Sequence, residues 1–151
     1  MLHSTFKHAL ARLMLVAFCL TGPVLTAMAG LDSYEIYLND KLILQQYVNQ
    51  PLDVRSLQLK NAKAGDRLVI YYRHCTLKGA GSGRSITLQD EKGKVMKKWH
   101  FEDSPGSNTS MVIPVAELLK LQKDRTNLSL HYQAAELPAG EMLASLRLKE
   151  A

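Results

Sequence analysis

The chain of 151 residues has little cysteine and few of the residues that interrupt regular structure. It contains two cysteines, five prolines and nine glycines, which excludes the disulfide-dense, collagen-like and low-complexity classes. It also lacks an apolar run of the roughly 20 residues that a transmembrane helix needs. Hydrophobic residues make up 46% of the chain and charged residues 22%, as in an ordinary globular protein. The composition therefore predicts one folded domain without a membrane span.

The first 29 residues carry the pattern of an export signal. Lys7 and Arg12 precede a short apolar run, and alanines two positions apart then provide a cleavage site. We expect cleavage after this segment, export to the periplasm or the medium, and a single domain over residues 30–151. Loss of the two basic residues lowers the formal charge from +5 to +3. Cys19 leaves lipid attachment as an alternative, although the bulky residue before it disfavours that processing.

From residue 34 onward, apolar and polar residues alternate in short runs separated by turn residues. Alternation with a period of two places one set of side chains on a buried face of a strand. The strongest run, residues 67–75, predicts a central strand. Leucines at helical spacing after Pro114 predict one short helix or helical turn near residues 115–122. The spacing of the runs predicts an all-β fold, an antiparallel β-sandwich of about eight or nine short strands.

Two local expectations follow from the same alternation. Trp99 falls on the apolar side of its run, so we expect its indole ring to enter the core. The sequence 138–140, Pro-Ala-Gly, predicts the turn between the last two strands.

Motifs for catalysis and for metal binding are absent from the sequence. It contains no Gly-x-Ser-x-Gly, Cys-x-x-Cys, His-x-His or Met-x-Met motif. A copper site in an exported protein is one alternative interpretation, since copper binds imidazole, thiolate and thioether. Its ligands would come from His74, Cys75, His100 and His131, together with the methionines Met96, Met111 and Met142. A thiol-dependent enzyme using Cys75 is a second alternative, and it requires a nearby histidine. The unpaired Cys75 also suggests a disulfide-linked dimer.

Two segments resemble binding motifs without meeting their requirements. The glycine-rich segment 79–85 contains Arg84 where a phosphate-binding loop has lysine, and a predicted strand follows it instead of a helix. It is interpreted as a loop between strands that serves partner binding. Lys97 and Lys98 belong to the most basic segment, and their alternation on a strand indicates a solvated sheet edge. Nucleic-acid binding is therefore not expected.

The sequence as a whole favours a small exported β-sandwich that acts as a non-catalytic binding or accessory module. Tyrosine side chains suit contact surfaces because they combine an apolar ring with a polar hydroxyl. Tyr37 and Tyr71 fall opposite the more aliphatic faces of their strands and are the predicted surface tyrosines; Arg84, Lys97 and Lys98 complete the predicted binding set. The expected partner is a protein or a glycan, and no cofactor is expected.

Overall fold

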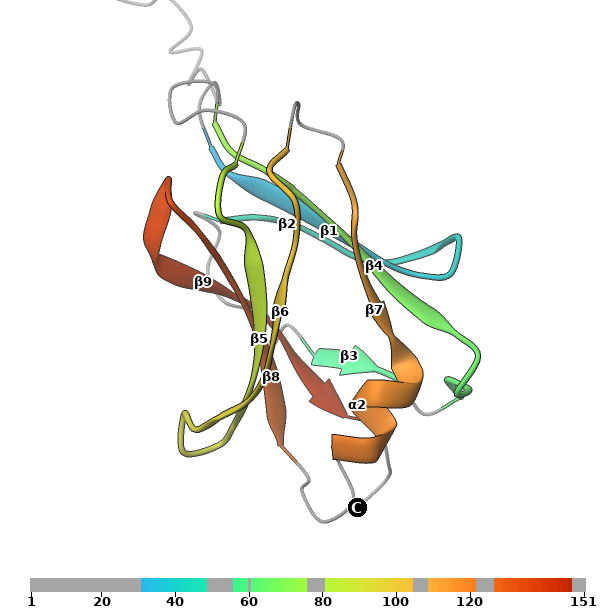
Figure 1. Cartoon of the computed structure of the whole chain (residues 1–151). Helices are drawn as coiled ribbons and strands as arrows, with labels where there is room; N and C mark the ends of the chain where they lie inside the picture. Colours follow the sequence, from blue (N-terminus) through green and yellow to red (C-terminus); the bar gives the residue numbers. More distant parts are fainter. Residues whose placement is uncertain are drawn as a thin grey trace, which may run out of the picture.

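A computed structural model describes residues 31–48, 56–59, 61–75, 81–104, 109–121 and 127–147. These residues form nine strands in two sheets and one short helix, so the prediction of an all-β sandwich is confirmed. The two sheets lie as layers, and the helix lies at one end of them (Figure 1). The predicted signal segment and its cleavage site lie outside the described residues.

The first sheet has four strands in the order β2-β1-β4-β7, and every pairing in it is antiparallel. Its strands are β1 (Ser33–Leu38), β2 (Lys41–Tyr47), β4 (Arg67–Arg73) and β7 (Met111–Pro114). β4 lies between β1 and β7, so the predicted central strand is confirmed. Asn39, with φ of 54°, makes the tight turn between β1 and β2, since asparagine tolerates this backbone conformation.

The second sheet has five strands in the order β3-β9-β8-β5-β6. Its strands are β3 (Ser56–Gln58), β5 (Ser85–Asp90), β6 (Val95–His100), β8 (Leu128–Ala134) and β9 (Leu137–Arg147). β3 pairs with β9 in parallel, which departs from the antiparallel expectation. The helix α2 (Val115–Leu121) follows Pro114 directly, as predicted. Within the described residues, no helix is long and apolar enough to span a membrane.

Alternating residues from both sheets meet in one hydrophobic core. The first sheet contributes Tyr34, Ile36, Leu68, Ile70, Met111 and Ile113, and the second contributes Ile86, Leu88, Leu130, Tyr132, Ala144 and Leu146. Each aliphatic side chain buried in this core stabilises the fold by about 1.5–3 kcal/mol. The period-two pattern therefore identified the inward faces correctly.

Two local predictions need correction. The turn between β8 and β9 is formed by Ala135 and Glu136, and residues 138–140 belong to the long strand β9 instead. Register shifts in the β8–β9 pairing let β9 accommodate Pro138 and Gly140. Trp99 is only half-buried: its ring packs against the core, and its indole N–H donates to Glu117 of α2 at 2.9 Å.

Candidate functional site

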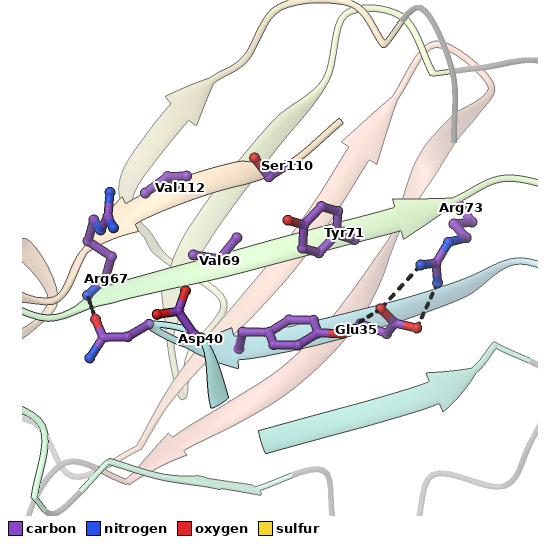
Figure 2. A pocket seen from close by; sticks show the side chains of 10 residues that line it. Glu35, Asp40, Arg67, Val69, Tyr71, Arg73, Ser110 and Val112 are labelled. Atoms are coloured by element: carbon purple, nitrogen blue, oxygen red, sulfur yellow. Dashed lines mark hydrogen bonds and ion pairs between the residues drawn. The ribbon is translucent and has the colours of Figure 1, made fainter. Parts of the chain in front are cut away.

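The outer face of the four-stranded sheet is hollowed into an open groove of about 630 Å³. We call it the outer groove; its walls are Glu35, Tyr37, Asn39, Asp40, Arg67, Val69, Tyr71, Arg73, Ser110 and Val112. Figure 2 shows Val69, Tyr71 and Val112 projecting to the same side from neighbouring strands. Seven of the ten wall residues come from β1, β4 and β7, because alternate residues of these strands face away from the core; Asn39 and Asp40 lie in the turn after β1, and Ser110 precedes β7.

An apolar row crosses this face from one edge of the sheet to the other. Leu42 of β2 pairs with Tyr37 of β1, and Tyr37 pairs with Val69 of β4. Val69 pairs in turn with Val112 of β7. The row ends in exposed side chains, since Leu42 is 44% and Val112 39% accessible to solvent. Four apolar residues are thus aligned across the strands on a face that the core does not use.

Tyr37 of this row contacts a second tyrosine, Tyr71 of β4, on the same face. The rings of Tyr37 and Tyr71 meet edge to face, with centroids 5.7 Å apart. The Tyr37 hydroxyl donates to Glu35 Oε2 at 3.0 Å, and this bond raises the pKa of Tyr37 above its ordinary value. Both tyrosines lie opposite the buried positions of their strands, where alternation predicts them; the contact between them was not part of that prediction.

The groove carries charge at both ends. Arg73 donates from both terminal nitrogens to Glu35, at 2.8 and 3.2 Å (Figure 2). These bonds lower the pKa of Glu35 and raise that of Arg73. At the other end, the guanidinium of Arg67 has no ion-pair partner among the described residues, while its backbone N–H donates to Asn39 Oδ1 at 3.0 Å. Arg67 therefore offers, beside the apolar row, a guanidinium that pairs with no carboxylate among the described residues.

The outer face of the five-stranded sheet is different in composition. Its side chains are mainly polar: Thr87, Gln89, Lys98, His100, Ser129, His131, Gln133 and Ser145. Two apolar residues, Met142 on β9 and Val95 on β6, are separated there by β8 and β5. No apolar row corresponding to Leu42–Val112 forms on the described part of this face.

A polar cluster lies buried between the sheets. Asp32 is 4% exposed; its carboxylate accepts the Tyr72 hydroxyl at 3.0 Å and the backbone N–H of Cys75 at 2.9 Å. His74 Nε2 and the Tyr132 hydroxyl are 2.9 Å apart. The rings of Tyr72 and Tyr132 stack with centroids 4.0 Å apart. Burial raises the pKa of both tyrosines, so both phenols are neutral. The cluster is therefore a hydrogen-bonded part of the core.

Gly81, in the described part of the glycine-rich segment, lies close to this cluster. Gly81 has φ of +98°, and a Cβ there would lie 3.1 Å from Arg84 Cδ and 3.3 Å from the Tyr132 hydroxyl. Arg84, predicted to contact a partner, is instead 2% exposed. It donates to the carbonyls of Glu102 and Thr109, each at 2.9 Å. Its guanidinium therefore links the start of β5 to Glu102 and Thr109, which lie between β6 and β7, and it does not line the outer groove.

Cys75 and the histidines occupy separate places. Cys75 is buried at 8% exposure, and the side chain of His74 is buried in the polar cluster. His131 lies on the outer face of the five-stranded sheet, 2.9 Å from Ser129 Oγ, and His100 is exposed at the end of β6. Among the described residues, no group of three or more His, Cys, Asp or Glu side chains is placed to hold a metal ion.

The two predicted lysines lie on β6, which forms an edge of the five-stranded sheet. Lys97 Nζ lies 3.7 Å from Glu117 of α2. Lys98 pairs with Thr87 on the outer face. The interpretation of this basic segment as a solvated sheet edge agrees with that position, and neither lysine reaches the outer groove.

Sequence reasoning missed Glu35, Arg67, Val69, Arg73 and Val112 as groove residues. Alternation alone places Glu35 and Arg73 on outward faces, and their opposite charges are a signal that they can pair. The register that brings β1 next to β4 and β4 next to β7 was not readable from local pattern.

Comparison with protein-family models found no matching family, and comparison with curated proteins found no matching protein.

Proposed function

We propose that this chain is an exported, non-catalytic binding module that holds a protein partner on the outer face of its four-stranded sheet. The observation that carries the proposal is the outer groove itself. It combines on one face an apolar row, the Tyr37–Tyr71 pair and the Arg67 guanidinium, for which the described residues provide no ion-pair partner. Such a mixture of apolar, tyrosine and arginine side chains is typical of protein-binding surfaces.

A protein partner is favoured over a glycan by the aliphatic part of the surface. Val69, Val112 and Leu42 offer no hydrogen bonds to sugar hydroxyls, whereas they complement apolar side chains. The two tyrosine rings also pack edge to face on each other. An apolar partner segment with a carboxylate placed to reach Arg67 fits this chemistry.

Capture from the envelope fraction of the native cell tests the binding function. The full sequence is expressed, and the purified chain is used as bait beside two variants, Val112→Lys and Gln133→Lys. Both add a lysine at an exposed strand position, but only the first lies in the outer groove. We expect the wild type and Gln133→Lys to retain one common partner, and Val112→Lys to lose it.

Three outcomes would contradict this proposal. The first is the absence of any specific partner, and the second is equal retention by all three chains. The third is a partner that survives protease digestion of the extract, because that result identifies a glycan instead of a protein.

Export is the second part of the proposal and rests on the pattern of residues 1–29. Mass spectrometry of the chain isolated from the envelope is expected to show an N-terminus at Gly30. An acylated Cys19 would replace this reading with membrane anchoring, and a retained Met1 would contradict export by cleavage.

A further inference from the structure

The outer face of the four-stranded sheet is balanced about a line that runs between its two central strands, β1 and β4. A half-turn about this line exchanges β1 with β4 and β2 with β7, since the strand order is β2-β1-β4-β7. The apolar row crosses the line with two residues on each side, in the order Leu42, Tyr37, Val69, Val112. Its two end residues, Leu42 and Val112, are exposed to solvent. The face is therefore apolar at matching positions on both sides of the line.

Unlike charges lie on opposite sides of the same line at one end of the outer groove. Arg67 begins β4, Asp40 lies in the turn between β1 and β2, and both line the groove (Figure 2). Neither side chain has an ion-pair partner among the described residues. A cation and an anion placed in this way make a surface complementary to its own copy, which is the condition for a two-fold interface.

We propose that the protein partner of the outer groove is a second copy of this chain, packed face to face about a two-fold axis parallel to the strands. The inference rests on the proposed function, because it uses the same face and names its partner. The half-turn places Leu42 over Val112 of the second copy, and Tyr37 over Val69 of the second copy. Each apolar residue of the row therefore meets an apolar residue, which removes both rows from water.

The same half-turn pairs the charges at the end of the groove. The backbone N–H of Asn39 donates to the carbonyl of Arg67 at 2.8 Å, so Arg67 comes opposite the turn that carries Asp40 in the second copy. Two symmetric ion pairs result. A two-fold axis across the strands would instead place Arg67 over Tyr71 of the second copy, where it finds no carboxylate. The axis parallel to the strands is therefore the one that uses both charges.

The far end of the groove is compatible with this arrangement. Glu35 meets Tyr71 of the second copy, and Arg73 meets Ser33, because these residues are register partners across β1 and β4. A phenol hydroxyl can donate to a carboxylate, and no like charges face each other there. The four strands lie about 4.8 Å apart and span only about 20 Å. The interface is small, so we expect a weak and reversible dimer.

Sedimentation velocity of the chain obtained by expressing the full sequence tests this inference, over concentrations from about 1 µM to about 1 mM. The wild type is expected to show a reversible monomer–dimer equilibrium that reductant does not change. Asp40→Arg and Arg67→Asp each bring like charges together in the dimer. Each is expected to raise its dissociation constant by about tenfold or more. The matched control Glu91→Arg, in the exposed turn between β5 and β6, is expected to keep the wild-type constant.

Mixing the two charge variants separates a loss of the interface from a loss of the fold. In the mixed pair, one chain has two cations at this end of the groove and the other has two anions, so unlike charges meet again. We expect the mixture of Asp40→Arg with Arg67→Asp to recover the wild-type dissociation constant to within about threefold. A misfolded variant cannot be rescued in this way.

Four results would overturn the pairing of two copies. They are a wild type that stays monomeric throughout the series, charge variants that dimerise as the wild type does, a mixture that stays monomeric, and a dimer that reductant abolishes. The envelope capture tests the proposed function separately. If the chain stays monomeric and Val112→Lys still loses a different protein, the binding face stands and only the identity of its partner is wrong. If no protein is captured either, both the inference and the proposed function are wrong.

Discussion

The two outer faces of the sandwich are built on the same core but differ in chemistry. On the four-stranded sheet, one row across the strands reads Leu42, Tyr37, Val69 and Val112. On the five-stranded sheet, a row in the same direction reads Met142, His131, Thr87 and Lys98. When one face of a sheet packs on the core and the other faces water, the side chains on the water-facing side are ordinarily polar. The second sheet follows that rule, and the first departs from it where the outer groove lies.

The largest expected effect is a loss of fold stability, which affects both outer faces because they are built on the same core. Asp32→Ala would leave the Tyr72 hydroxyl and the Cys75 N–H without their buried acceptor. We expect this to lower the free energy of unfolding by about 3 kcal/mol, measured by urea denaturation. The exposed Asp40→Ala is expected to cost less than about 0.5 kcal/mol. Equal losses in the two variants would show that the polar cluster does not stabilise the core.

Partner affinity separates the two faces. Tyr71→Ala removes a ring from the outer groove and is expected to weaken binding of the captured partner by about 2 kcal/mol, or roughly thirtyfold. His131→Ala on the opposite face is expected to leave the affinity unchanged. Isothermal titration calorimetry measures both, with circular dichroism to confirm that each variant is folded. A loss confined to His131→Ala would exchange the roles of the two faces.

Stability in acid probes the ion pair of the outer groove. Hydrogen bonds from Arg73 lower the pKa of Glu35 below its ordinary value of 4.5. The stabilisation is therefore present above that pH and is lost as the pH falls through the lower folded value. The wild type is expected to lose about 1 kcal/mol of its free energy of unfolding through this pair on acidification, as for a partly exposed pair. We expect this loss to be absent in Glu35→Gln. Urea denaturation at pH 7, 5, 4 and 3 measures it.

Exposed Glu91, in the turn between β5 and β6, offers the matched control for that series. Glu91→Gln is expected to keep the wild-type dependence of stability on pH. If Glu35→Gln and Glu91→Gln give the same curve as the wild type, the Arg73–Glu35 pair contributes no stability.

The smallest effect belongs to the polar face. Burial lowers the pKa of His131 below its ordinary 6.5, so the unfolded chain binds this proton more readily than the folded chain does. Stability must then decrease as the pH falls below that value. In His131→Gln, the midpoint temperature of thermal unfolding is expected to decrease less between pH 7 and 5 than in the wild type. Partner affinity is expected to stay unchanged. A steeper decrease in the variant would contradict the assignment.

The sequence predicts the faces of the strands better than it predicts their neighbours. Alternation put Tyr34 and Ile36 inside and Tyr37 and Tyr71 outside, because side-chain direction depends only on position along a strand. The contact between the two tyrosines depends on the pairing of β1 with β4, more than 30 residues apart in the chain. The outer groove, which needs that pairing, could be predicted only in part.

Residues that are held by distant loops escaped prediction. Arg84 is a charged residue in a glycine-rich segment, and such residues are usually exposed. It is buried because the carbonyls of Glu102 and Thr109, which are 18 and 25 positions away, accept its donors. The parallel pairing of β3 with β9 likewise joins segments that are far apart in the chain, residues 56–58 and 145–147. Local patterns contain no information on contacts that form between such distant segments.

Site-specific photo-cross-linking in the native cell tests whether the outer groove is the binding face. A photo-reactive phenylalanine is introduced in place of Val112 in the outer groove and, in a second chain, in place of Gln133 on the polar face. We expect irradiation to attach a protein partner to the chain labelled at position 112 and none to the chain labelled at position 133. A partner attached through position 133 alone, or through neither position, would contradict the outer groove as the binding face.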